Sequence, residues 1–384
     1  MADVVVIGGG PAGSALAAMA AEAGAEVTLV ERKRFPRDKL CGGFVAATGC
    51  GVLQRLGVLE RLTESGASPI RACRLTSRDG RVLDVPLPAD ALGVSRARLD
   101  LTLADRARAR GADVVHGWEA LEPVRTAAGE VEGVVVREVG RDETRVLRAP
   151  VVVAADGRRS RFARLVHDCP GDPARTRPAS RFALQAHLSG GTQRVDGRVD
   201  LHLIRGGYAG LAPIEGRRLN LCLLIRVREL RAVGGSPDRV LSELVRRNPA
   251  ADAAIGGSRP AGRWRSVGPL RFGPRRAAGG GVLLVGDAAG TVDPFAGEGI
   301  SHALVSAELA LPWVLRAAEH GRLDPDDARR YAEVWDRRFG AVTRRIRRLG
   351  RLLERPAIAD RVLLALEYAG GSWPRRIIAS THGP

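Results

Sequence analysis

The first thirty residues carry the pattern that most restricts how this chain can fold. Residues 3–7 (DVVVI) are a short apolar run rich in β-branched side chains, and three glycines follow at once in GxGxxG spacing. An alanine-rich stretch then favours a helix, and residues 26–30 (EVTLV) have the composition of a second strand. Strand, tight turn, helix and strand in this order predict a βαβ unit, and therefore an α/β fold with a Rossmann-like parallel sheet.

The turn of this unit has the chemistry of a dinucleotide site. Its glycines are Gly8, Gly10 and Gly13, and the helix starts at Pro11 and Ala12. Such glycines let the backbone approach a pyrophosphate, while the helix N-terminus offers N–H donors and a positive dipole. Glu31 follows the first glycine by 23 residues, where a carboxylate can accept hydrogen bonds from ribose hydroxyls. A carboxylate at this position favours an adenosine with a free 2′-hydroxyl, and therefore FAD or NAD over NADP. The alternative to a dinucleotide site is an ordinary glycine turn.

Two later segments repeat parts of this chemistry. Residues 151–155 (VVVAA) are a buried-type strand that runs into Asp156 and Gly157. Residues 282–285 (VLLV) lead into a glycine-rich turn with a carboxylate, and an apolar helix follows. This order describes a second phosphate or polyol site at the end of a strand, which a two-ended cofactor needs and a simple NAD dehydrogenase does not. For Asp156, an ordinary type I turn remains the alternative.

These segments together resemble the FAD motifs of para-hydroxybenzoate hydroxylase-fold flavoproteins. The resemblance rests on GGGPAG with ER at residues 31–32, on ADG at 155–157 and on GDAAGTVDPFAGEGI at 286–300. FPRDKLCGG at 35–43 and SRARLD at 95–100 are most similar to one branch of that family. It contains geranylgeranyl reductases, FAD-dependent halogenases and oxidoreductases of polyketide pathways. The resemblance covers about residues 1–320.

The resemblance implies FAD as cofactor and assigns roles by position. Glu31 would bind the adenosine ribose, Arg96 would lie along the flavin chain, and Asp287 would bond the ribityl hydroxyls. The helix that begins near Ile300 would point its N-terminus at the flavin, where negative charge collects on reduction. The complete set of expected cofactor-binding residues is Gly8, Gly10, Pro11, Ala12, Gly13, Glu31, Arg32, Lys39, Cys41, Gly42, Arg96, Asp156, Gly157, Gly286, Asp287, Pro294, Gly297, Glu298, Gly299 and Ile300.

The spacing of the motifs predicts interleaved domains. We expect a discontinuous FAD-binding domain from residues 1–70, 90–165 and 270–320. Residues 71–89 and 166–269 would form a substrate domain, because residues 181–228 alternate apolar and polar side chains as in a half-buried antiparallel sheet. An Asp79-Gly80 hairpin would add two strands, and a helix over 237–247 would cover part of the sheet. Residues 321–384 would form C-terminal helices.

Three side chains are candidate reacting groups: Tyr208, Cys41 and His302. Each has a plain alternative, namely sheet packing for Tyr208, an inert thiol for Cys41 and a helix-interior position for His302. Near Tyr208, Gly210 and Ala212 replace the bulky rings of the related enzymes, so we expect a space above the flavin that is wider or shaped for a planar guest. Two further histidines, His187 and His202, are expected on a solvent-facing surface, with a place in the pocket lining as the alternative.

The favoured function is an NAD(P)H-dependent monooxygenase that uses a flavin C4a-hydroperoxide on an aromatic or polyketide-type molecule in secondary metabolism. A reductase or dehydrogenase acting on carbon–carbon double bonds is the alternative, and a non-enzymatic basic binding protein is a second one. Halogenation is disfavoured because neither of the two lysines, Lys33 and Lys39, lies after Cys41. NAD(P)H would visit transiently as electron donor, or a flavin reductase or carrier protein would take part.

Charge and composition narrow the partners. The net charge is +17, but all except two of the 60 basic residues are arginine, a usage typical of a GC-rich genome. No basic segment is interleaved with aromatic residues, so we expect no nucleic-acid partner. The glycine-rich start is neither a signal peptide nor a spanning helix, and the cysteines form no CxxC pair. A cytoplasmic protein without disulfides or a bound metal is the expectation.

Positive charge is concentrated near the C-terminus, where residues 329–361 hold eleven arginines against four acidic residues. Apolar residues recur there at three- and four-residue steps, which predicts an amphipathic helix. They are Phe339, Val342, Ile346, Leu349 and Leu353. A helix that caps the FAD domain is the favoured interpretation. Peripheral docking on an anionic membrane or a carrier domain is the alternative.

Overall fold

The computed structural model describes residues 2–166, 181–192, 195–270 and 272–353. Its opening segment is the expected βαβ unit: β1 (Val4–Ile7), α1 (Pro11–Glu22) and β2 (Val27–Glu31). Strands β1 and β2 pair in parallel. Every side chain of β1 is buried, as is usual for a strand covered on both faces.

A six-stranded sheet grows outward from β1 on both sides. Its order is β18-β19-β10-β1-β2-β6, with β6 (Asp113–His116), β10 (Val151–Ala154), β18 (Ala278–Gly279) and β19 (Val282–Leu284). All neighbours pair in parallel except β18 with β19. The strands that precede the three sequence motifs, β1, β10 and β19, are therefore adjacent, and their carboxyl ends meet at one edge of the sheet.

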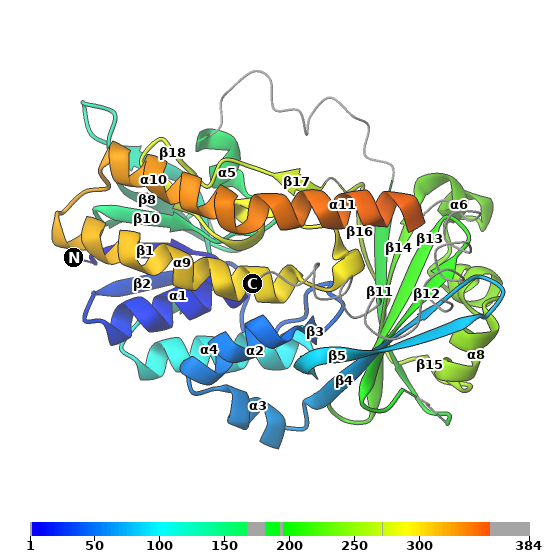
Figure 1. Cartoon of the computed structure of the whole chain (residues 1–384). Coiled ribbons are helices and arrows are strands. Elements are labelled where there is room, and N and C mark those ends of the chain that lie inside the picture. Colours follow the sequence, from blue (N-terminus) through cyan, green and yellow to red (C-terminus); the bar gives the residue numbers. More distant parts are fainter. Residues whose placement is uncertain (1, 167–180, 193–194, 271, 354–384) are drawn as a thin grey trace.

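Helices and a small sheet cover this parallel sheet (Figure 1). Helix α1 packs between α4 (Arg96–Ala109) and α9 (Gly299–Glu319). A three-stranded antiparallel sheet of β7 (Trp118–Arg125), β8 (Val131–Glu138) and β9 (Thr144–Arg148) packs against β10 and β2. These layers share one apolar core with β1, β10 and β19.

The second body is a nine-stranded, mostly antiparallel sheet, as expected, which stands at the right of Figure 1. Its main order is β15-β11-β14-β13-β12-β4-β5-β3, and β16 pairs with β11. The Asp79-Gly80 turn does join two of its strands, β4 and β5, and only β12 with β4 is parallel. The strands are β3 (Phe44–Val45), β4 (Ser68–Thr76), β5 (Val82–Gly93), β11 (Arg181–Ser189), β12 (Arg198–Ile204), β13 (Gly207–Ile214), β14 (Arg218–Arg226), β15 (Arg259–Pro260) and β16 (Arg265–Val267).

Short helices cover the face of this sheet that points away from the parallel sheet. They are α6 (Val227–Ala232), α7 (Pro237–Val240), the π-helix η1 (Leu241–Val245) and α8 (Pro249–Ile255). The expectation that His187 and His202 face solvent is wrong, since they are only 7% and 0% exposed. Nδ1 of His202 lies 2.8 Å from Thr76 Oγ1, and Asn248 of the covering layer donates to the same Thr76 oxygen, while Nε2 of His202 is buried without a hydrogen-bond partner among the described residues.

The C-terminal part of the described chain is helical, as predicted. It runs through α10 (Pro325–Trp335), the π-helix η4 (Asp336–Gly340) and α11 (Ala341–Leu353), and the rest of the expected segment, 354–384, lies outside the described residues. Figure 1 shows α11 extending from the parallel-sheet body toward the large sheet. None of the described helices combines the length and the apolar character that crossing a bilayer requires. The remaining elements are α2 (Ala47–Arg55), α3 (Leu59–Glu64), α5 (Arg161–Val166), β17 (Gly273–Pro274), β20 (Gly290–Thr291) and the short helices η2 (Gly286–Ala288) and η3 (Pro294–Ala296).

One buried hydrogen bond ties the C-terminal helices to the motif strands. Tyr331 on α10 is fully buried, and its hydroxyl donates to the Leu284 carbonyl of β19 at 2.7 Å. Tyr331→Phe keeps the ring but removes this donor, so the free energy of unfolding should fall by about 1–3 kcal/mol. Chemical denaturation followed by tryptophan fluorescence measures the change.

The matched control removes an exposed hydroxyl. Ser242→Ala deletes a surface donor to the Asp238 carbonyl and should change the unfolding free energy by less than about 0.5 kcal/mol. Equal effects of the two substitutions would contradict the role given to Tyr331.

Candidate functional site

A large cavity lies where the carboxyl ends of β1, β10 and β19 meet the inner face of the nine-stranded sheet. Its walls come from all three sequence motifs, the 35–43 loop and the large sheet. The expected cofactor-binding residues that line it are Gly10, Pro11, Ala12, Lys39, Cys41, Gly42, Arg96, Gly157, Asp287, Pro294, Gly297, Gly299 and Ile300. Segments separated by more than a hundred residues in the sequence therefore form one site.

The glycine turn is shaped by close backbone contacts. Gly8 has φ +103°, and a Cβ there would lie 2.6 Å from the Ala155 carbonyl oxygen. A Cβ on Gly13 would lie 2.0 Å from the carbonyl oxygen of Gly8. Neither glycine lines the cavity. Their role is to let α1 and β10 approach β1 closely enough to place the start of α1 at the cavity wall.

The N-terminus of α1 has the donor groups that an anion needs. Its N-cap residue, Gly10, supplies no side-chain cap, and Gly10, Pro11 and Ala12 all line the cavity. A Cβ added to Gly10 would meet only the Arg96 guanidinium, at 3.6 Å. The helix therefore presents uncapped backbone N–H groups and its positive end to an open cradle, which fits a pyrophosphate.

Glu31 lies beside this turn rather than in the cavity wall. It is 7% exposed, and its Oε2 accepts hydrogen bonds from the Gly9 N–H at 2.8 Å and from the Arg37 guanidinium at 2.9 Å. Oε1 accepts from the Lys33 N–H at 2.9 Å. In this arrangement the carboxylate holds the shape of the glycine turn, at the end of β2 where a ribose-binding acid is expected.

Two charged residues that we did not predict connect Glu31 to the cavity. Arg37 also donates to Asp100 Oδ2 at 2.9 Å, and Asp100 accepts two hydrogen bonds from Arg96, each 2.8 Å long. All four side chains of this hydrogen-bonded network are at least nine-tenths buried: Glu31, Arg37, Asp100 and Arg96. Arg37 lies in the motif FPRDKLCGG and Asp100 in the motif SRARLD. Their opposite charges were the only sequence signal that could have predicted their pairing.

Lys39 adds a second cation to the cavity wall. Its side chain is accessible and lines the cavity, and its Nζ would be 3.0 Å from a Cβ on Gly157. Partial burial within these walls, and next the charge of Arg96, lower the pKa of Lys39, while Asp287 opposes the shift. A bound anion would relieve the repulsion between the two cations, so this part of the site also fits the phosphates of a dinucleotide.

The 286–300 turn forms the opposite side of the cavity. A Cβ on Gly286 would be 3.0 Å from the Ala12 side chain, so this turn packs directly on α1. Helix α9 begins at Gly299, and its first two residues line the cavity, which places the positive end of the helix there. Glu298 is fully buried behind this wall, and burial raises its pKa to about 8.

Some expected site residues do not reach the cavity. Arg32 pairs with Glu119 at 3.6 Å on the surface. Oδ2 of Asp156 accepts from the Arg161 N–H at 2.8 Å, which ties it to the start of α5. The tight turn beside it begins one residue later than the type I turn considered from the sequence, because the Ser160 N–H donates to the Gly157 carbonyl at 2.8 Å. His302 packs against Phe339, with ring centroids 4.9 Å apart, instead of lining the cavity. The residues that support the site without lining it are Gly8, Gly13, Glu31, Gly286 and Glu298.

The other two candidate reacting groups, Tyr208 and Cys41, do line the cavity. Tyr208 lies on β13, packs edge-on against Phe295 and donates its hydroxyl to Asp293 Oδ1 at 3.5 Å. Cys41 lies within electrostatic reach of Arg96, and its carbonyl accepts from the Asn220 side chain at 2.9 Å. Two more thiols line the cavity, Cys73 and Cys222, and burial raises the pKa of each to about 12.

The sheet side of the cavity is open and aliphatic. A Cβ on Gly210 would touch nothing closer than the Cys222 carbonyl oxygen at 3.5 Å, and Ala212 is also in the wall, as expected for a widened space. Leucine and valine side chains supply most of the remaining wall. They are Leu40, Leu75, Leu83, Val85, Leu87, Val199, Leu201, Leu223, Leu224 and Leu270.

Comparison with known proteins agrees with this geometry. Residues 1–345 match the family model described as "FAD binding domain". The digeranylgeranylglycerophospholipid reductase 2 of Methanopyrus kandleri is 32% identical over 350 residues, which are 88% of this chain and 83% of that protein. The menaquinone reductase of Mycolicibacterium smegmatis is 31% identical over 331 residues, 80% of this chain and 75% of its own.

Solved structures share the fold at lower identity. The myxobacterial chondrochloren halogenase CndH aligns with a TM-score of 0.79 at 22% identity, covering 89% of this chain and 81% of its own. PqsL of Pseudomonas aeruginosa, described as a probable FAD-dependent monooxygenase, aligns with a TM-score of 0.72 at 21% identity, covering 92% and 95%. This chain belongs to the FAD-binding-domain family of FAD-dependent oxidoreductases and has the para-hydroxybenzoate hydroxylase fold.

Proposed function

We propose that this chain is an FAD-dependent reductase that saturates carbon–carbon double bonds in an isoprenoid-type chain. The observation that carries the proposal is the aliphatic wall of the cavity, where leucine and valine side chains of β4, β5, β12 and β14 face the FAD motifs. Such a wall suits a flexible hydrocarbon chain. Contact with the wall removes the apolar surface of the substrate from water, and a hydrocarbon needs no hydrogen-bond partners there. The names of the 31–32% identical relatives, reductases of a geranylgeranyl lipid and of menaquinone, support the same substrate class.

Bound FAD would supply the two electrons of the reduction, and the protein must supply a proton to the carbon skeleton. Cys41 is the group that we assign to this task, since it lines the cavity beside Arg96. Cys73 and Cys222, with pKa values of about 12, hold their protons too firmly. Tyr208 has its proton directed to Asp293, so we give it the role of positioning the substrate. NAD(P)H, bound transiently, or a partner reductase would provide the electrons.

A second candidate function is a monooxygenase acting on an aromatic or polyketide-type molecule. The open strand at Gly210 and Ala212 favours it, because a flat wall without bulky side chains accommodates a planar ring. The fold shared with PqsL points the same way. The two candidates differ in their need for O2: the reductase works without it, whereas the monooxygenase consumes it.

Anaerobic turnover separates the two. Holoenzyme reduced with dithionite is mixed without O2 with geranylgeranyl diphosphate or with menaquinone, and the flavin absorbance and product mass are recorded. We expect reoxidation of the flavin and a product in which a double bond of the prenyl chain is saturated and no oxygen is added, which differs from simple reduction of the menaquinone ring to its quinol. A product that forms only after O2 is admitted, and that contains an added oxygen atom, would establish the monooxygenase instead.

Cys41→Ser tests the assigned proton donor. Because a serine hydroxyl is a much weaker acid, kcat should fall about 100-fold or more, while FAD absorbance stays unchanged. Cys50→Ser is the matched control, since Cys50 donates to the Val45 carbonyl outside the cavity wall, and it should retain turnover. Equal kcat for the wild type and Cys41→Ser would remove Cys41 from the reaction.

A further inference from the structure

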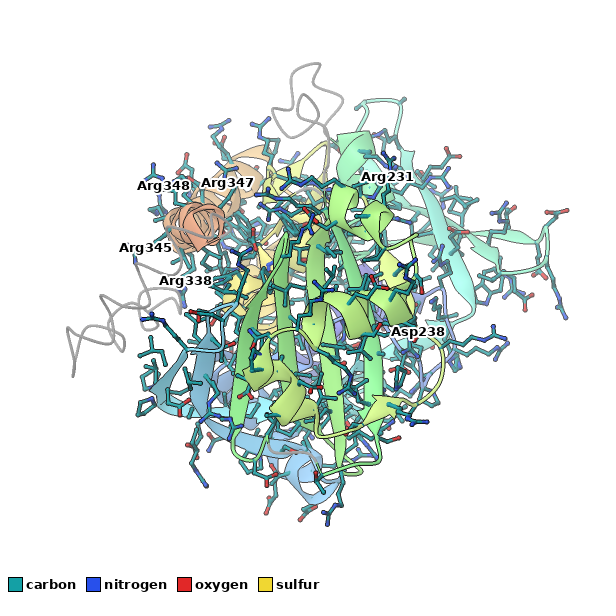
Figure 2. All side chains as sticks on the ribbon, turned by 90° about the vertical axis from the view of Figure 1, so that its right-hand side faces the viewer. Arg231, Asp238, Arg338, Arg345, Arg347 and Arg348 are labelled. Carbon is teal, nitrogen blue, oxygen red and sulfur yellow. The ribbon has the colours of Figure 1, made fainter. Side chains whose placement is uncertain are left out.

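The outer surface of α11 is strongly basic. Residues 341–353 contain five arginines and no acidic residue. Arg344, Arg345 and Arg348 are exposed, and we call these three side chains the arginine face. Figure 2 views α11 end-on and shows Arg345, Arg347 and Arg348 arranged around it. Asp336 lies 4.0 Å from Arg344, and a contact this long between exposed groups offsets little of the charge on Arg344.

The inner surface of α11 is already used. Val342 and Ile346 are 7% and 0% exposed, and they pack against Val292 and Ala296. Val292 and Ala296 in turn line the cavity. Helix α11 therefore lies directly over the cavity wall, with its apolar side turned inward and its arginine face turned outward.

We propose that the arginine face of α11 docks this protein on the anionic surface of a lipid bilayer. We choose this partner because of charge complementarity. Three exposed arginines lie on one helix without acidic residues between them, and they match a layer of lipid phosphates. A nucleic acid fits less well, because residues 341–353 contain no aromatic side chain for base stacking and Phe339 is buried. That docking brings the cavity to its substrate rests on the proposed function, whereas the docking itself does not.

The packing of α11 also determines how it binds. An interfacial amphipathic helix normally sinks its apolar face into the acyl region. Here that face contacts the cavity wall, so the attraction to the bilayer is electrostatic alone. Binding should therefore require anionic lipid and should disappear at an ionic strength of about 1 M, where the Debye length is about 3 Å.

Vesicle sedimentation of the full-length holoprotein tests the proposal. The probes are vesicles of phosphatidylcholine alone and of phosphatidylcholine mixed with phosphatidylglycerol. We expect binding to the mixed vesicles only. The triple variant Arg344→Gln, Arg345→Gln, Arg348→Gln should bind them more weakly by a factor on the order of 100, with its FAD absorbance unchanged.

The control variant removes the same charge elsewhere. Arg78→Gln, Arg231→Gln, Arg247→Gln changes three exposed arginines of the large-sheet body, one on the hairpin turn, one on α6 and one between η1 and α8, and should bind like the wild type. Equal loss in both triple variants would overturn the proposal, because it would mean that net charge alone drives binding. Binding that survives high salt, no binding to mixed vesicles, or tighter binding to a single-stranded polynucleotide would also overturn it. Since sedimentation needs no turnover, failure of the proposed reaction would leave this result standing.

Discussion

The site depends on how closely three backbones approach one another at the start of the chain. Gly8 sits against the Ala155 carbonyl, and Gly13 sits against Gly8, at distances where any side chain would collide. These contacts bring α1 and β10 against β1, and the parallel pairing of β10 with β19 then carries the 286–300 turn to the same edge. The cavity follows from this arrangement, because the carboxyl ends of adjacent parallel strands, with the helix starts that follow them, converge on one point.

Charge at this edge is arranged for an anionic guest. Asp100 lies between Arg37 and Arg96, and Arg37 also reaches Glu31, so four charged side chains are buried together, each hydrogen-bonded to an oppositely charged partner. Burying such a network is unfavourable unless each charge is paired, and here each charge has an oppositely charged partner, while Arg37 Nε is buried without a hydrogen-bond partner among the described residues. Three cations line the cavity, Lys39, Arg96 and Arg158, and together with two helix N-termini they give the dinucleotide half its positive potential. The aliphatic wall opposite makes the other half suitable for an apolar guest.

Much of this arrangement could be predicted from sequence, and the failures have physical reasons. Periodicity and glycine spacing predicted the βαβ unit, the large antiparallel sheet and the amphipathic C-terminal helix, because each depends on local pattern. Glu31 and Arg32 were assigned together, yet successive residues at a strand end point to opposite sides, so only Glu31 faces the site. Arg37 and Asp100 pair across 63 positions, which no local pattern reveals. His202 was misplaced because helices that follow later in the chain cover its strand.

We infer that three segments far apart in the sequence bind one elongated cofactor. Hydrogen–deuterium exchange of the apoprotein with and without added FAD tests it most directly, since backbone amides that bind or pack on the cofactor exchange more slowly. We expect FAD to slow exchange in residues 8–13, 155–158 and 286–300 together. Slowing confined to residues 8–13, with the other two segments unchanged, would contradict it.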